Sequence, residues 1–73
     1  MMPTVYNYDI SEILDGEPSE DLIAASQDAE PTGAVPAFRD EDGIWQYVEP
    51  SRRDFYERHL HHEIITVYVE MDD

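Results

Sequence analysis

The sequence predicts an α+β fold, a small four-stranded and mainly antiparallel sheet with one or two helices packed on one face. Two observations predict it. Segments with the two-residue period or the β-branched content of strands occur near both ends and in the middle of the chain. Segments with helical spacing lie between them, and proline or glycine separates most of the elements. This order is typical of α+β proteins, and 73 residues suit a single domain, 1–73.

The first strand is expected at residues 4–10, where Tyr6 and Tyr8 share one face and alternate with residues of the other face. Asp9 and Glu12 have the spacing of a capping box, and apolar residues at helical spacing follow. We therefore expect a short helical turn after the strand, ended by the first glycine.

A second helix is expected later in the N-terminal half. Ser19 is a suitable N-cap, and the two acids after it suit the positive end of the helix dipole. The helix should end near Asp28 or Ala29, before Pro31. Its apolar face is thin, so part of residues 15–33 is expected to be mobile.

The clearest hairpin spans residues 34–48, and its two arms flank the connection Asp40-Glu41-Asp42-Gly43. A four-residue connection that ends in glycine fits a type I turn followed by a residue with positive φ. Pro36 has no N–H to donate, so its strand is expected to lie at an edge of the sheet or to start late.

A helix is expected over residues 52–62, after an N-cap at Ser51. Two pairs of oppositely charged residues stand four apart and predict ion pairs within this helix: Arg53 with Glu57, and Asp54 with Arg58. Four residues form its apolar stripe: Phe55, Tyr56, His59 and Leu60.

The last strand is expected at residues 64–69, which are dense in β-branched and aromatic residues on both faces. Such a strand is typical of the centre of a sheet. Residues 71–73 are expected to leave it as an acidic tail. No apolar stretch approaches the roughly 20 residues that cross a bilayer, and the first residues do not resemble a secretory signal. A cytoplasmic protein without a membrane partner is therefore expected.

Charge is the most distinctive property of the chain. It has 18 acidic residues, four arginines and no lysine, which gives a formal net charge of −14 at pH 7. A magnitude of roughly 2–8 keeps a small domain soluble, and a larger excess opposes folding through self-repulsion. No basic residue precedes Arg39, so the N-terminal third forms an unbroken anionic surface. This predicts a basic partner, such as the nucleic-acid groove of another protein.

The residues expected to contact this partner are acids of the N-terminal third and of the hairpin connection. Aromatic side chains that the fold leaves exposed are expected to add apolar anchors. Together they are Asp9, Glu12, Asp15, Glu17, Glu20, Asp21, Asp40, Glu41 and Asp42, with Tyr6, Tyr8, Trp45 and Tyr47.

One cluster has metal-ligand chemistry. On a helix, His59, His62 and Glu63 would be spaced i, i+3, i+4 and could converge on one ion. The cluster lacks the HExxH pattern and a distant fourth ligand, so imidazoles that compensate a helix dipole are the simpler interpretation. Neither a metal nor another cofactor is expected.

No pattern predicts catalysis, because the serines are explained by caps and turns and there is no cysteine nucleophile. In size and charge, though in no motif, the chain resembles the small acidic inhibitors that phages make against restriction or CRISPR nucleases. The resemblance implies a DNA-mimic inhibitor of the anti-restriction or anti-CRISPR type, encoded by a phage or mobile element. It would occupy a basic surface of a host protein or nucleoprotein complex without itself binding nucleic acid.

Two other hypotheses stay open at this point. The chain could be an antitoxin-like cap for a basic toxin, which a neighbouring gene for a basic protein would indicate. It could instead be a halophilic interaction protein without mimicry, which unfolding at low salt would indicate. The oligomeric state also stays open, because the hairpin edge with Pro36 or the strand at residues 4–10 could pair across a homodimer.

Overall fold

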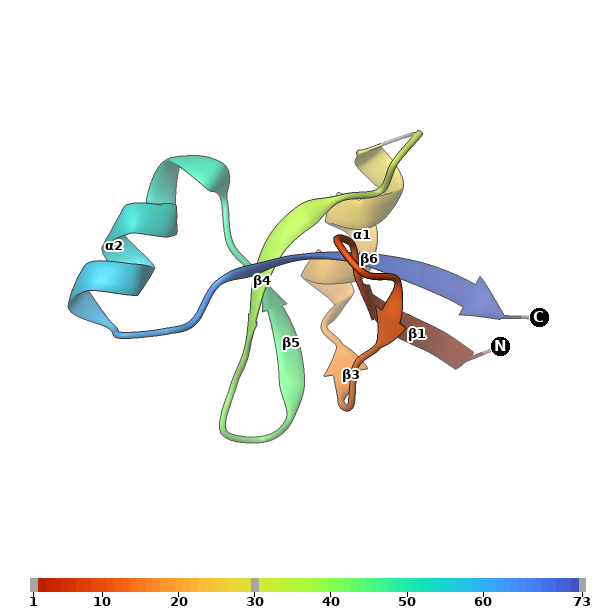
Figure 1. Cartoon of the computed structure of the whole chain (residues 1–73), viewed down its shortest axis with the longest axis horizontal. Helices are drawn as coiled ribbons and strands as arrows, with labels where there is room; N and C mark the ends of the chain where they lie inside the picture. Colours follow the sequence, from red (N-terminus) through yellow and green to blue (C-terminus); the bar gives the residue numbers. More distant parts are fainter. Residues whose placement is uncertain (1, 30, 73) are drawn as a thin grey trace.

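The computed structural model describes residues 2–29 and 31–72, and it confirms the α+β class. Its elements are β1 (Met2–Asn7), β2 (Glu12–Ile13), β3 (Glu17–Pro18), α1 (Glu20–Asp28), β4 (Val35–Arg39), β5 (Ile44–Tyr47), α2 (Arg53–His59) and β6 (Ile65–Asp72). Six strands form one mixed sheet in the order β2-β1-β6-β4-β5-β3 (Figure 1). The predicted number of four strands is wrong, because two strands of two residues each extend the sheet at its edges.

The helical turn expected after the first strand is not formed. The chain reverses into β2, so that Tyr6 pairs with Ile13. The Asn7 side-chain oxygen accepts a hydrogen bond from the Asp9 backbone N–H at 3.0 Å, and the Asn7 carbonyl accepts one from Ser11 N–H at 2.7 Å. Ser11 has a φ of 52°, which closes the turn. Asp9 therefore lies in a hairpin turn and caps no helix.

The helix α1 begins and ends as predicted. The Ser19 hydroxyl accepts a hydrogen bond from Leu22 N–H at 3.2 Å, as an N-cap does, and Ala29 is the C-cap. Residues 15–33 thus contribute β3, α1 and the turn that leads to β4. Leu22 anchors this segment, since its side chain is fully buried against the sheet.

The hairpin of β4 and β5 is confirmed, but the position expected for the proline strand is wrong. β4 lies inside the sheet, between β6 and β5. The Pro36 carbonyl accepts a hydrogen bond from Val48 N–H at 3.1 Å, so the N–H that proline lacks would face Val48, just beyond the end of β5. An interior strand tolerates proline at this position because the neighbouring strand has already ended, so the sheet loses no hydrogen bond of its regular ladder. Neither β4 nor β1 is outermost in the sheet, although β2 pairs only with Tyr6 and Asn7 of β1.

The predicted helix over residues 52–62 is too long at both ends. The chain enters it through a 3-10 turn at Pro50–Arg52, and the N-cap is Arg52, not Ser51. The helix stops at His59, and His61 has a φ of 56°. His62 is thereby turned onto the ring of Phe38 from β4, with ring centroids 4.0 Å apart.

The strand β6 is central, as predicted, with β1 on one side and β4 on the other. Val67 at its middle is fully buried. The acidic tail expected at residues 71–73 is not a tail as far as the structure describes it, because Met71 and Asp72 pair with β1. Asp73 lies outside the described residues.

Two apolar clusters hold the fold together. Because Ala37 and Phe38 are neighbours on β4, their side chains point to opposite faces of the sheet. Ala37 belongs to the main cluster, which α1 covers, and Phe38 belongs to a second one, which α2 reaches through Tyr56. The two helices therefore pack on opposite faces of the sheet. The expectation that they would share one face is wrong. The main cluster consists of Val5, Leu22, Val35, Ala37, Trp45 and Val67, and the second of Phe38, Val48 and Ile64.

Among the described residues, Ser26 is the one polar residue that is buried. Its hydroxyl donates a hydrogen bond to the Gly33 carbonyl at 2.9 Å and accepts one from Val69 N–H at 3.0 Å, which ties α1 to β6. We expect Ser26→Ala to lower the free energy of unfolding by about 1–3 kcal/mol, because two part-buried backbone groups lose their hydrogen-bond partner. Urea denaturation measures this loss. Gln27→Ala, an exposed neighbour on α1, is the control, and equal stability of the two variants would contradict the prediction.

Candidate interaction surface

Acidic segments that are far apart in the sequence meet at one end of the sheet. The indole N–H of Trp45 donates a hydrogen bond to the Asp15 carbonyl at 2.7 Å, and Glu17 N–H donates one to the Gly43 carbonyl at 3.2 Å. β3 runs parallel to β5 beside these bonds. The acids at positions 15 and 17 therefore lie next to the acidic connection of residues 40–42 (Figure 1).

This close approach requires a glycine at position 16. Gly16 has a φ of 108°, and a Cβ atom there would lie 2.4 Å from the Gly43 carbonyl oxygen. The same packing buries Trp45, whose side chain is 8% exposed. Trp45 was expected among the aromatic anchors for a partner, but it is a core residue whose indole N–H is already hydrogen-bonded.

The Asp40 carboxylate stabilises the acidic connection through three hydrogen bonds. Its Oδ1 accepts backbone hydrogen bonds from Ile44 and Asp42, both at 2.9 Å, and its Oδ2 accepts one from the Gln46 side chain at 2.9 Å. These bonds, with that from Ile44 the largest, hold the pKa of Asp40 below its ordinary value of 3.8. Asp40 therefore shapes the turn, while Glu41 and Asp42 are exposed at its tip.

A depressed pKa makes the contribution of Asp40 to stability dependent on pH. The contribution is present above the pKa of the unfolded chain and is lost as the pH falls through the folded pKa. In Asp40→Asn, an amide nitrogen replaces one carboxylate oxygen and cannot accept the hydrogen bond from the Gln46 side chain. The variant should therefore unfold at a lower temperature than the wild type at pH 7. We expect this difference to shrink as the pH falls below the ordinary value of 3.8. Thermal unfolding followed by circular dichroism tests it, with Asp42→Asn as the control; a constant difference would contradict it.

A shallow groove of about 620 Å³ runs between α1 and β5. Tyr47 lines it and is half-buried, and alanines on α1 leave the space open. Three exposed carboxylates also line it, those of Asp21, Asp28 and Glu49. An aromatic ring with several carboxylates matches the chemistry of an arginine or lysine side chain, through ion pairs and a cation–π contact.

Two of these carboxylates are absent from the set expected from the sequence. Asp21 and Asp28 are seven residues apart, which is two turns of one helix face, so helical periodicity could have grouped them. Glu49 follows β5, and only the packing of α1 over β5 brings it to the groove. Asp21 and Tyr47 are the two expected residues that line it.

The other expected residues lie outside the groove. Tyr6 stacks on Tyr68 of β6 with ring centroids 5.0 Å apart, and Tyr8 meets the edge of the same ring at 6.3 Å. Tyr6 is next to the buried Val5 on β1, so the tyrosines lie on the sheet face that α1 does not cover. The acids not mentioned so far are exposed: Asp9 and Glu12 on the β1–β2 hairpin, and Glu20 in the first turn of α1.

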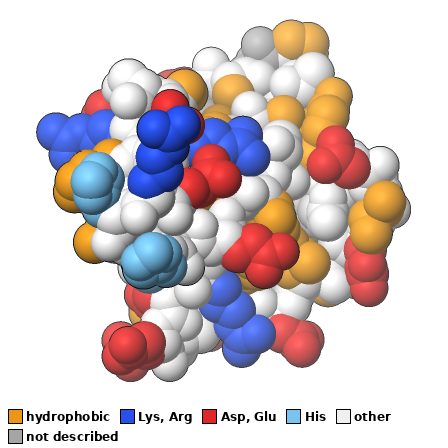
Figure 2. All heavy atoms as spheres, turned by 60° about the vertical axis from the view of Figure 1, so that its left-hand side comes forward, with side chains coloured by type: hydrophobic (Ala, Val, Ile, Leu, Met, Phe, Trp, Pro, Cys, Tyr) orange, Lys and Arg blue, Asp and Glu red, His pale blue; other side chains and the backbone are white. Residues whose placement is uncertain are grey.

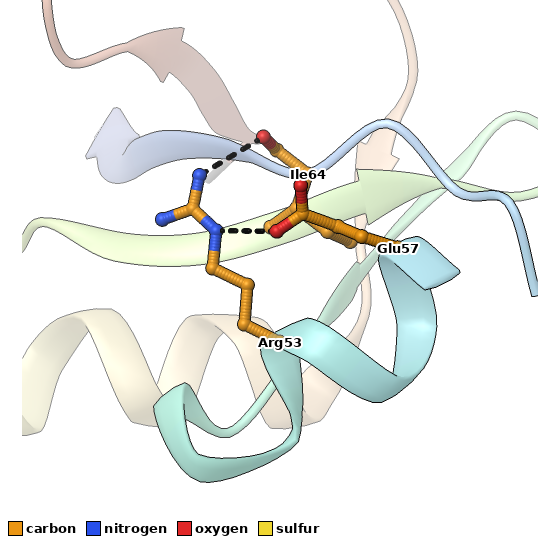
Figure 3. A network of polar contacts seen from close by, with 3 residues as sticks. All are labelled: Arg53, Glu57 and Ile64. Carbon is orange, nitrogen blue, oxygen red and sulfur yellow. Dashed lines mark hydrogen bonds and ion pairs between the residues drawn. The ribbon is translucent and has the colours of Figure 1, made fainter. Parts of the chain in front are cut away.

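Three of the four arginines lie on or just before α2, whereas Arg39 ends β4 beside the acidic connection; Figure 2 shows basic and acidic side chains together on this side of the molecule. Arg53 pairs with Glu57 at 3.0 Å, as predicted, and also donates to the Ile64 carbonyl at 3.3 Å (Figure 3). This is the single ion pair among the residues that the structure describes. The pair expected between Asp54 and Arg58 is not formed. Within the same described residues, the acids of the groove and of the acidic connection are therefore not neutralised by salt bridges.

The helical spacing that made His59, His62 and Glu63 a candidate metal cluster is not formed either, because α2 ends at His59. No three His, Asp or Glu side chains within residues 2–29 and 31–72 are grouped as metal ligands. In the same part of the chain, no helix is both long and apolar enough to span a membrane. No family model, curated protein or solved structure matches the chain.

Proposed function

We propose that the protein binds a basic, nucleic-acid-binding surface of another protein or nucleoprotein complex and thereby blocks it. The observation that carries the proposal is the concentration of carboxylates around α1, β3 and the acidic connection, none of which forms an ion pair within the described residues. A rigid array of negative charge competes for the positive groove that would otherwise bind phosphates. An inhibitor of the DNA-mimic type, active in the cytoplasm, is the function that this arrangement supports best.

The groove between α1 and β5 provides the specific part of the contact. An arginine or lysine side chain of the target would enter beside Tyr47, between Asp21, Asp28 and Glu49. Carboxylates outside the groove, such as Glu41 and Asp42, would act at longer range by accelerating the encounter. This division predicts that the groove determines the dissociation rate, whereas the surrounding charge determines the association rate and its dependence on salt.

Capture from the native host tests the proposal. The tagged chain is expected to retain a protein or complex that binds nucleic acid, and excess duplex DNA is expected to release it. A target that binds DNA and this chain at the same time would overturn the proposed competition. A basic toxin encoded beside this chain, retained in the same way but indifferent to DNA, would point to the antitoxin-like alternative.

A further inference from the structure

The helix α2 is held to the body of the protein by few side chains. Tyr56 packs against Phe38 with ring centroids 5.6 Å apart, and Arg53 reaches the Ile64 carbonyl. The next residues of the predicted apolar stripe point away from this contact, since Phe55 is 52% and Leu60 is 46% exposed. A helix of seven residues is not stable by itself and depends on packing of its apolar face. Half of that face has no cover within the described part of the chain.

The segment that carries this face is rich in charged residues but has no net formal charge. Residues 50–64 contain three arginines and three acids, whereas the rest of the chain has Arg39 against fifteen acids. Figure 2 looks at this end of the molecule and shows arginine, histidine and apolar side chains side by side on its surface. Two copies of a chain with a net charge of −14 repel each other through most orientations. They can approach at low electrostatic cost where α2 faces α2.

A hollow of about 320 Å³ lies beside Phe55, with Arg52 as its other lining residue. It offers space for an apolar side chain of a facing helix. We infer that the α2 surface, formed by Arg52, Phe55, Arg58, His59 and Leu60, is the interface of a two-fold homodimer.

The charge of the molecule favours a second copy over other occupants. A basic partner is drawn to the groove and the acidic connection, and an anionic partner is repelled by the chain as a whole. The occupant must therefore present a nearly neutral and partly apolar surface, which is what α2 itself presents. In a two-fold arrangement each patch meets its own copy, so the arginines of one α2 can face the acids of the other. This inference does not depend on the proposed function.

Sedimentation equilibrium tests the dimer with the purified full chain, from micromolar to millimolar concentration. We expect a monomer–dimer equilibrium that shifts toward dimer when NaCl is raised from about 0.15 to 1 M, because salt screens the repulsion between the two acidic bodies. Phe55→Glu and Leu60→Glu should each weaken the dimer by about tenfold or more. Ile13→Glu is the matched control, because Ile13 is 64% exposed, lies in the acidic part and gives the same change in net charge.

A second measurement separates loss of the dimer from loss of the fold. The chain has no cysteine, so Ser51→Cys and Glu20→Cys each provide one site for a spin label. The label next to α2 should show dipolar coupling between two copies, and the label on α1 should show much weaker coupling. A monomer at every concentration and salt, a dimer unaffected by Phe55→Glu, or stronger coupling from position 20 would overturn the inference.

Discussion

Leu22→Ala is expected to unfold a large fraction of the protein at 25 °C. Leu22 is fully buried at the centre of the main cluster, and truncation of a buried leucine costs about 2–5 kcal/mol. A stability of about 0.05–0.15 kcal/mol per residue gives roughly 4–11 kcal/mol for a chain of this length. Small size and self-repulsion place this protein toward the lower end. The loss is therefore comparable with the whole stability of the fold.

Urea denaturation of the variant and of a matched control measures this effect. Alanine is the strongest helix former, so a loss in Leu22→Ala reports the cavity and not the helix. Ile10→Ala truncates an aliphatic side chain that is 64% exposed. The free energy of unfolding is expected to change there by no more than about 0.5 kcal/mol. High salt should recover part of the stability of both variants by screening the repulsion among acids. Equal losses at positions 10 and 22 would show that Leu22 is not the anchor of α1.

The elements that the sequence predicts correctly have local causes. Ser19 caps α1 with its own side chain, and the acidic connection ends at Gly43, which has a φ of 79°. The missed elements depend on distant contacts. The two-residue strands β2 and β3 are too short to show a strand periodicity in the sequence. The close approach of Gly16 to Gly43 depends on the pairing of β3 with β5, which are far apart in the sequence. Likewise, α2 ends early where His62 stacks on Phe38, a ring that lies 24 positions before it.

The candidate site divides in the same way. The excess of acids and the exposure of Glu41 follow from composition and turn chemistry, and both could be predicted. The groove could not, because Glu49 and Asp21 become neighbours only when α1 lies over β5. Trp45 shows the opposite error. Aromatic character alone does not distinguish an exposed anchor for a partner from a core residue. In the structure, Trp45 is buried and its indole N–H is hydrogen-bonded to the Asp15 carbonyl.

The double variant Asp21→Lys/Asp28→Lys is expected to weaken binding of the basic target by about 100-fold or more. Close charge pairs across an interface can be coupled by about 1.5–7 kcal/mol, and each reversal here replaces an attraction with a repulsion. The fold should survive, since both side chains are exposed. A lysine in the first turn of α1 opposes the helix dipole, and one in the last turn favours it, so the two effects offset each other.

The matched control is Glu63→Lys/Glu70→Lys, which changes two exposed acids outside the groove. Both double variants have the same net charge, so a general loss of long-range attraction affects them equally. Surface plasmon resonance with the captured target should show a faster dissociation rate for the groove variant and only a slower association rate for the control. If the two variants bind alike, total charge governs recognition, and Asp21 and Asp28 do not hold a basic side chain of the target. If neither loses affinity, none of the four substituted carboxylates contributes to binding, which contradicts the proposed role of the groove.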